Sequence, residues 1–208
     1  MRQRLVLVNP SFQRQVRRVA QTSVGPPLGL AYLAAVARAA GHQVVVVDAN
    51  ALGLGVEETA RRVRALDPTV VGVTATTPTV DLAGAIAAAL RQGGPRVPVV
   101  LGGPHGTALP ARTLAEQPAV DVVVRGEGEE VLPALLARLV GGALDPTALA
   151  EVRGLAFRAD GDEVVDTGVA APIADLEALP QPARDLLPMD RYRCPDSDAF
   201  TTLLAMRG

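Results

Sequence analysis

Short loops rich in glycine, proline and threonine follow five valine-rich runs along the chain, and they hold the residues best suited to contact a ligand. Glycine lets a bulky or flat ligand lie directly on the main chain, and threonine adds a hydroxyl with little bulk. The candidate contacts are Pro10, Ser11, Leu28, Gly29, Thr74, Thr76, Thr77, Gly102, Gly103, Pro104, His105, Gly126, Glu127 and Gly128. This set suits the binding of a ligand rather than nucleophilic attack on it.

The sequence motifs of several other kinds of site are absent. No G-x-G-x-x-G follows the first valine-rich run, so the fingerprint of dinucleotide-binding proteins is missing. The chain contains no lysine, which excludes the P-loop motif, and it has no G-x-S-x-G nucleophile elbow. These absences predict a binding site without a catalytic residue of its own.

The two histidines of the chain, and the glutamates that follow the fifth run, are expected in different parts of the fold. His42 falls in a helix-to-strand turn at the amino edge of the sheet, out of reach of the loops. His105 follows the fourth run, where it either touches a ligand or hydrogen-bonds to backbone. Glu127, Glu129 and Glu130 begin a helix, whose positive end favours acidic residues.

The elements that position these loops follow from the apolar pattern. The expected strands are Leu5–Val8, Val44–Val47, Val70–Val73, Val97–Leu101 and Val120–Val124. The expected helices are Leu28–Ala40, Val56–Leu66, Val80–Arg91, Ala108–Glu116 and Glu129–Val140. The strands are apolar on both faces, which is typical of a parallel sheet covered by helices on each side. Five strand–helix units predict an α/β fold, a doubly wound five-stranded parallel sheet of flavodoxin-like, Rossmann-like order, whose ligands bind at the carboxyl ends of the strands.

The remainder of the chain has a different character. Residues 143–170 are expected to form a helical connector and then a β-hairpin, Gly154–Arg158 with Glu163–Asp166, that turns at Asp160-Gly161. Residues 171–208 are interrupted by prolines, which predicts a linker that runs over a surface and leads to a missing second domain.

Bulk composition excludes several classes of protein. A net charge of −2 argues against a general nucleic-acid binder. The single cysteine, Cys194, rules out an internal disulfide and a multi-cysteine metal site within these residues, and its neighbours do nothing to activate it. No apolar run is long enough to span a bilayer and no secretory signal opens the chain, so we expect a cytoplasmic protein.

Taken in order, the loop motifs resemble a known family. They are V-N-P at 8–10, P-P-L-G-L-A-Y-L-A at 26–34, G-H-Q-V-V-V-V-D at 41–48, V-G-V-T-A at 71–75, L-G-G-P-H at 101–105 and G-E-G-E at 126–129. The tail adds G-L-A-F-R at 154–158 and L-P-Q-P-A-R-D-L-L-P at 179–188. The chain resembles the cobalamin-binding domain that precedes the catalytic barrel in cobalamin-dependent radical S-adenosylmethionine (SAM) enzymes. On this resemblance residues 1–142 form the cobalamin-binding domain.

The resemblance implies how the cofactor would be held. Thr74 matches a serine beside the nucleotide tail in more distant cobalamin domains, and Gly102 and Gly103 match their paired glycines. Those domains also carry D-x-H-x-x-G after the first strand, whose histidine ligates cobalt, and this chain has no counterpart there. The similar stretch Asp48–Gly53 follows the second strand instead, and we interpret it as a strand end and turn. Cobalamin is therefore expected in a base-off state with no protein histidine ligand and no metal-binding side chain.

The resemblance further implies a cobalamin-dependent radical SAM methyltransferase acting on an unactivated carbon, with SAM and a 4Fe-4S cluster held by the chain's own C-terminal barrel, which is missing here. Two alternatives stay open at this point. One is a cobalamin-dependent radical SAM cyclase or rearrangement enzyme. The other is a degenerate scaffold domain that no longer binds cobalamin.

Overall fold

The five valine-rich runs form a parallel sheet. A computed structural model describes residues 2–12, 24–139, 143–159, 163–194 and 200–203. The five parallel strands are β1 (Arg4–Asn9), β2 (Gln43–Asp48), β3 (Val70–Thr74), β4 (Val99–Gly102) and β5 (Val122–Val124). They lie in the order β2-β1-β3-β4-β5, with all neighbouring pairs parallel. The expected fold class and strand order are confirmed.

The C-terminal hairpin extends this same sheet. Strands β6 (Leu155–Arg158) and β7 (Val164–Asp166) pair antiparallel with each other, and β6 pairs antiparallel with β5. The result is a mixed sheet of seven strands rather than five parallel strands with a separate hairpin. The expected Asp160-Gly161 turn lies outside the described residues. Because β6 covers β5, the edge strand of the parallel sheet is paired instead of open to solvent.

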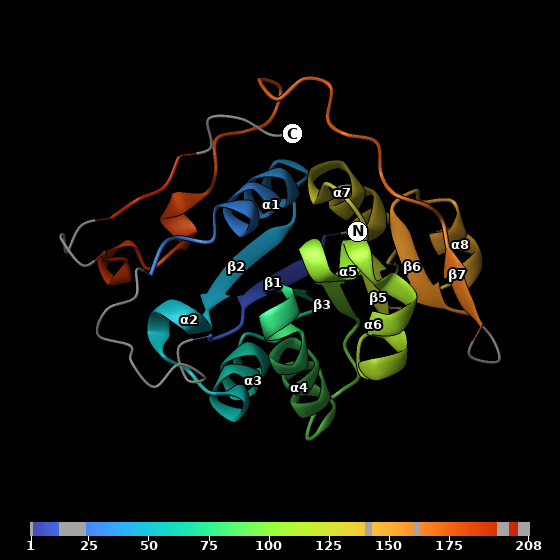
Figure 1. Cartoon of the computed structure of the whole chain (residues 1–208), viewed down its shortest axis with the longest axis horizontal. Coiled ribbons are helices and arrows are strands. Elements are labelled where there is room, and N and C mark those ends of the chain that lie inside the picture. Colours follow the sequence, from blue (N-terminus) through green and yellow to red (C-terminus); the bar gives the residue numbers. More distant parts are fainter. Residues whose placement is uncertain (1, 13–23, 140–142, 160–162, 195–199, 204–208) are drawn as a thin grey trace.

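Helices cover both faces of the sheet, as Figure 1 shows. One face carries α1 (Leu28–Ala39) and α7 (Gly128–Arg138), with α8 (Pro146–Ala150) beside β6. The other face carries α3 (Val56–Ala65), α4 (Val80–Arg91) and α6 (Pro110–Glu116). Two short helices, α2 (Ala49–Leu52) and α5 (Pro104–Ala108), follow β2 and β4, and the single turn η2 (Thr77–Thr79) precedes α4.

The core consists of two apolar layers, one on each side of the sheet. Leu5, Leu7 and Val100 face α1 and α7, while Val6 and Val71 face α3 and α4. Neighbouring residues of a strand point to opposite faces, so a strand buried on both sides must be apolar throughout. This requirement explains why the strands read as continuous valine-rich runs. No helix in the described part of the chain is long and apolar enough to cross a membrane.

The helix expected at Ala108–Glu116 is wrong in its bounds. The structure has α5 ending at Ala108 and α6 beginning at Pro110, with Leu109 between them at φ −132° and ψ 55°. Proline has no N–H to donate and suits the first position of a helix, so Pro110 starts a new helix. The helix expected at Glu129–Val140 begins one residue earlier, at Gly128, and ends at Arg138; Val140 lies outside the described residues.

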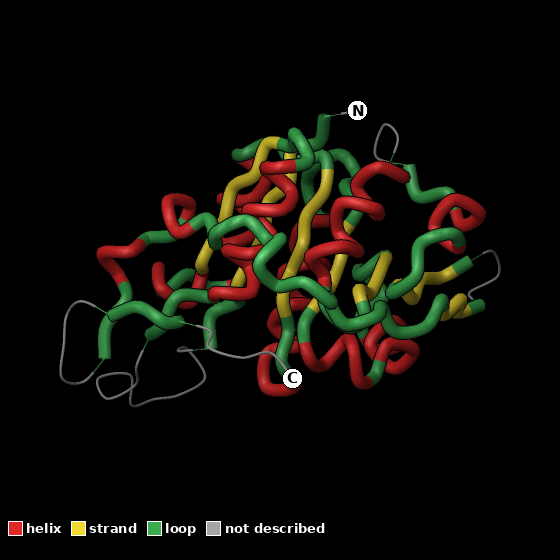
Figure 2. Tube along the Cα trace, turned by 90° about the horizontal axis from the view of Figure 1, so that it is seen from above, coloured by secondary structure: helices red, strands yellow, loops and turns green. Residues whose placement is uncertain are grey.

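The proline-rich segment after β7 crosses the face that carries α1 and α7. In Figure 1 it passes over α7 towards α1, and Figure 2 shows loop segments crossing the strands and helices on this side. The backbone N–H of Ala183 donates to Ala31 of α1 at 3.0 Å, and Arg38 pairs with Asp185 at 2.6 Å. Two single turns follow, η4 (Arg184–Leu186) and η5 (Met189–Arg191). The segment therefore docks on the parallel domain in its described part, whereas 204–208 lie outside the described residues.

A buried carboxylate fixes the amino edge of the sheet. Asp121, 8% exposed, accepts from the backbone N–H of Val99 at 2.7 Å and from Arg96 at 2.9 Å, and it also pairs with Arg91. Arg91 ends α4, and its side chain also donates to the carbonyl oxygens of Val97 and Ala119. Asp121 thus ties α4 to the first residues of β4 and β5.

Removing this carboxylate should destabilise the fold. Asp121→Ala leaves the half-buried Arg91 and the Val99 N–H without their acceptor, so we expect a loss of about 2–4 kcal/mol of unfolding free energy. Chemical denaturation followed by circular dichroism measures it. The matched control is Arg96→Ala, which removes a largely exposed partner of the same carboxylate and should cost less than about 1 kcal/mol. Equal losses of unfolding free energy in the two variants would contradict the role of Asp121 in tying α4 to β4 and β5.

Candidate functional site

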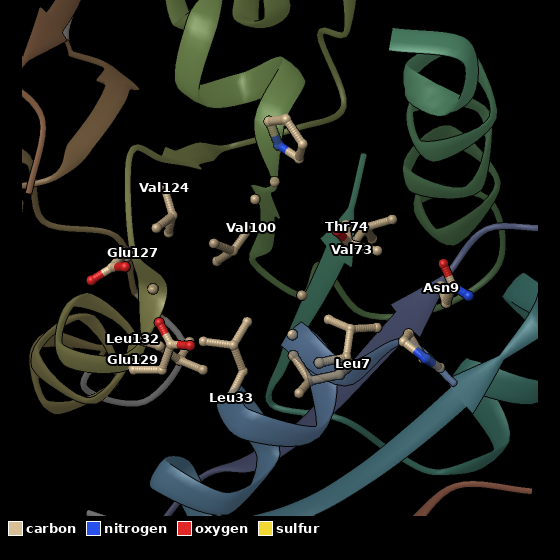
Figure 3. Close-up of a pocket in the computed structure, with 18 of the residues that line it drawn as sticks. Leu7, Asn9, Leu33, Val73, Thr74, Val100, Val124, Glu127, Glu129 and Leu132 are labelled. Carbon is tan, nitrogen blue, oxygen red and sulfur yellow. The ribbon is translucent and has the colours of Figure 1, made fainter. Parts of the chain in front are cut away.

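A cavity of about 710 Å³ opens at the carboxyl edge of the sheet. Its floor is the end of β1, β3, β4 and β5, and its walls are α1 on one side and the start of α7 on the other (Figure 3). A volume of this size is typical of small-molecule sites. The cavity lies where a parallel α/β sheet is expected to bind its ligand, because the loops after all the strands converge there.

Most of the residues selected from the sequence line this cavity. Those that do are Leu28, Gly29, Thr74, Thr76, Gly102, Gly103, Pro104, Gly126, Glu127 and Gly128. They come from four different loops, which the order of the strands brings to one edge. Their role as ligand contacts remains a proposal.

Four of the selected residues do not line the cavity, namely Pro10, Ser11, Thr77 and His105. Pro10 and Ser11 follow β1 directly and are buried, and the hydroxyl of Ser11 has no partner within the described residues. His105, 6% exposed, has Nδ1 at 3.2 Å from the Thr77 hydroxyl, and its Nε2 has no partner within that same part of the chain. His105 lies in α5 and bonds to a side chain, whereas the sequence predicts contact with either a ligand or the backbone.

His42 lies at the opposite edge of the sheet. Its Nδ1 accepts from the backbone N–H of Gln3, just before β1 begins, at 3.1 Å. Burial lowers the pKa of His42 below its ordinary value, which favours the neutral ring that accepts this bond. The placement expected from the sequence is confirmed.

The threonines after β3 have different tasks. Thr76 and Thr79 form a reciprocal cap on η2: the Thr76 N–H donates to the Thr79 hydroxyl at 2.9 Å, and the two hydroxyls are 3.1 Å apart. Thr77 bonds to His105. Thr74 lies at the end of β3, directly beside Gly102 of β4, so its side chain stands on the floor of the cavity.

Two glycines of the site are required by the protein's own backbone. Gly103 has φ +99°, and a Cβ there would lie 2.6 Å from the Ala75 carbonyl oxygen. Gly126 has φ +86°, and a Cβ there would lie 3.1 Å from the Val169 side chain and 3.3 Å from the Ala170 carbonyl oxygen. Residues with side chains rarely adopt such positive φ values, and these contacts leave no room for one. The glycines therefore shape the loops whether or not a ligand binds.

Two other glycines have no such structural reason. Gly29, in the first turn of α1, and Gly102, at the end of β4, both line the cavity, and a Cβ at either position would meet nothing within 4 Å. Glycine costs stability in a helix or strand relative to alanine. Their absent side chains leave the main chain of α1 and β4 open to whatever enters the cavity.

The loop after β5 is held between the cavity and the C-terminal segment. The Glu127 carboxylate accepts from the backbone N–H of Ile173 at 2.6 Å, and the Gly126 N–H donates to the Thr107 hydroxyl at 3.0 Å. In Figure 3 the Glu127 side chain points away from the centre of the cavity. Glu129 is buried on the cavity wall, whereas Glu130 is exposed. Glu127 thus anchors the segment that crosses α7.

The sequence did not reveal the apolar walls of the cavity. These residues are Leu7, Leu30, Leu33, Val73, Val100, Val124 and Leu132, and the polar Asn9 was also missed as a site residue. Apolar residues of strands and helices look the same in sequence whether they fill a core or line a cavity. For Asn9 a signal existed, since it is a polar residue at the carboxyl end of a buried strand.

A metal centre built from protein side chains is not found in the described residues, where no three His, Cys, Asp or Glu side chains gather to hold an ion.

Asp48 ends β2 and its side chain caps α2, a single turn closed by Gly53 at φ +64°. The interpretation of Asp48–Gly53 as a strand end and turn is confirmed.

Comparison with known sequences gives a consistent family. The model of the B12 binding domain matches residues 15–136. A protein of Pyrococcus horikoshii described as an uncharacterized methyltransferase is 37% identical over 205 residues, which is 99% of this chain and 43% of that protein. An anaerobic magnesium-protoporphyrin IX monomethyl ester cyclase of Cereibacter sphaeroides is 35% identical over 85% of this chain and 28% of its own length. The chain thus spans less than half of these curated relatives.

Solved structures share the fold at lower identity. The cobalamin-dependent SAM radical enzyme OxsB, with aqua-cobalamin and SAM bound, aligns with a TM-score of 0.71 at 18% identity, over 89% of this chain and 25% of its own. The radical SAM methyltransferase TsrM of Kitasatospora setae, with cobalamin and a [4Fe-4S] cluster bound, aligns with a TM-score of 0.65 at 23% identity, over 81% of this chain and 31% of its own. The fold, the position of the cavity and the family match agree: this chain belongs to the B12-binding domain family.

Proposed function

We propose that this chain binds cobalamin at the carboxyl edge of its parallel sheet and serves as the cofactor-binding part of a longer cobalamin-dependent radical SAM protein. The observation that carries the proposal is the cavity between α1 and α7, which Gly29 and Gly102 keep open although nothing in the protein's own packing requires glycine there. Cobalamin is much larger than this cavity. The part that enters would therefore be the nucleotide tail, and the corrin ring would stay outside, over the ends of the strands.

The residues present fit the two parts of this cofactor. Leu7, Leu33 and Leu132 give the cavity apolar walls suited to an aromatic base. Gly102 and Gly29 would let a broad ring approach the main chain, and Thr74 offers a hydroxyl beside Gly102. The open glycines and intact cavity argue against the degenerate scaffold, because such a domain would be free to fill this space with side chains.

The geometry also favours binding of cobalamin with its own base displaced from the cobalt and with no histidine of the chain taking the place of that base. His105 is turned towards Thr77, and His42 lies at the far edge of the sheet. A tail held in the cavity would have its base away from the metal. When bound, cobalamin supplies a cobalt atom that can carry a methyl group. The chain's part is to hold the tail, to support the ring on backbone and to exclude water from the cavity.

The reaction of the whole protein would take place outside these residues. Methyl transfer to an unactivated carbon is the first candidate, supported by the 37% identity to a protein described as a methyltransferase. Cyclisation is the second, supported by three relatives described as magnesium-protoporphyrin IX monomethyl ester cyclases at 31–35% identity. In both cases SAM and the iron–sulfur cluster would be held by a C-terminal radical SAM barrel, towards which residues 171–208 would act as a linker.

Cobalamin binding can be measured directly on the chain. After incubation with hydroxocobalamin and removal of free cofactor by gel filtration, we expect cobalamin to remain bound, with the shorter-wavelength visible absorption of the base-off state. A protein shown by circular dichroism to be folded that retains no cofactor would contradict the proposal. Retention with a base-on spectrum would contradict the tail-in-cavity arrangement alone.

Substitutions at the adjacent Gly102 and Gly103 distinguish an effect on cofactor binding from an effect on folding. In Gly102→Val the new side chain enters open space, so we expect stability within about 1 kcal/mol of wild type and cobalamin affinity at least about tenfold lower. In Gly103→Ala the Cβ meets the Ala75 carbonyl at a positive φ, so we expect a loss of about 1–3 kcal/mol of unfolding free energy. Thermal unfolding without cofactor and optical titration with it give the two quantities. Unchanged affinity in Gly102→Val would exclude a corrin over β4.

A further inference from the structure

A fully buried carboxylate lies one strand away from the cavity. Asp48, at the end of β2, is 0% exposed. Its Oδ1 accepts from the backbone N–H groups of Asn50 and Ala51, each at 3.1 Å, and from Nδ2 of Asn9 at 2.9 Å. Its Oδ2 accepts from the hydroxyl of Tyr192, also fully buried, at 2.8 Å. The four donors hold Asp48 in one orientation.

This arrangement fixes which way the amide of Asn9 faces. The two backbone N–H groups can only donate, so Asp48 Oδ1 is an acceptor, and the group of Asn9 beside it must be the NH₂ end. The carbonyl oxygen of Asn9 then lies on the other arm of the planar amide. In the described part of the chain this is the single side-chain hydrogen bond of Asn9.

Asn9 also lines the cavity, at the end of β1. Figure 3 shows it on the side of the cavity opposite Glu127 and Glu129, with its amide nitrogen directed away from the other labelled residues. An oxygen that is held as an acceptor at this edge selects for a hydrogen-bond donor. The periphery of the corrin ring carries carboxamide side chains, whose N–H groups are such donors.

We propose that Asn9 is a cofactor-binding residue whose Oδ1 accepts a hydrogen bond from a corrin carboxamide, and that the buried Asp48 is the residue that positions it. The inference rests on the proposed function and adds a polar contact at the edge formed by β1, where Pro10 and Ser11 had been expected to serve. Asp48 does not itself line the cavity, so it acts through Asn9.

Tyr192 completes the arrangement from the C-terminal segment. A phenol is protonated at neutral pH, and burial, together with the charge and hydrogen bond of Asp48, raises the pKa of Tyr192 further above its ordinary value, so its hydroxyl is a firm donor to Asp48. The neighbouring Arg193 pairs with Val24 through two backbone hydrogen bonds of 3.1 and 2.8 Å. The segment that leaves the domain is thereby attached to the same carboxylate that orients Asn9.

The test combines three substitutions in the whole chain, with hydroxocobalamin affinity from optical titration as the readout. Asn9→Leu keeps the size of the side chain and removes the acceptor, so we expect roughly tenfold weaker binding. Asp48→Leu releases the Asn9 amide and should weaken binding by a similar factor. Asp48→Asn should bind within about twofold of wild type, because its oxygen can still accept the three N–H groups and so hold the Asn9 amide. Its NH₂ then faces the Tyr192 oxygen and removes the acceptor of the phenol O–H, which should lower stability rather than affinity.

The combination Asn9→Leu with Asp48→Leu separates positioning from general damage. If Asp48 acts through Asn9, Asp48→Leu has no further effect on affinity once Asn9 is leucine, whereas structural damage would add to the loss. Tyr192→Phe, with circular dichroism on every variant, controls for the fold. Wild-type affinity in Asn9→Leu, or additive losses in the double variant, would overturn the inference. Failure of the unaltered chain to bind cobalamin would instead overturn the proposed function.

Discussion

The parallel pairing of β1 to β5 is the constraint on which the rest of the structure depends. Each parallel connection must return across a helix, so every strand ends at the same edge of the sheet and every following loop begins there. Five loops that are far apart in sequence are therefore neighbours in space. The cavity at this edge is lined by the strand ends and by residues of α1 and α7, the two helices that cover one face.

Within the cavity, the protein's own packing distinguishes two kinds of glycine. Gly103 and Gly126 adopt positive φ values that the turns require, so they would be glycine in a domain with no ligand at all. Gly29 and Gly102 are different, because a side chain there would meet only open space. The same residue type at adjacent positions, 102 and 103, thus has two physical causes. The pair at Gly29 and Gly102 is the stronger argument for a ligand.

Much of the fold follows from the sequence because strands buried on both faces must be apolar throughout, and glycine or proline marks the ends of the helices. The loops of the site follow in turn from the parallel order of the strands. What the pattern could not give depends on contacts between distant residues. The pairing of β6 with β5 and the turn of His105 towards Thr77 are of this kind. The break at Leu109 is different, because Pro110 next to it is a local signal that the sequence already contains. The apolar walls of the cavity were missed because Leu7 and Val100 have the same character as any core residue.

The tail-in-cavity arrangement is tested most directly by comparing the affinity of the chain for cobalamin with its affinity for cobinamide, which has the corrin ring but lacks the nucleotide tail. Because the cavity is lined mainly by apolar side chains, insertion of the tail should contribute a large share of the binding free energy. We expect cobalamin to bind at least about a hundredfold more tightly than cobinamide, which corresponds to about 2.7 kcal/mol. Equal affinities would contradict the account, since the cavity would then have no part in holding the cofactor.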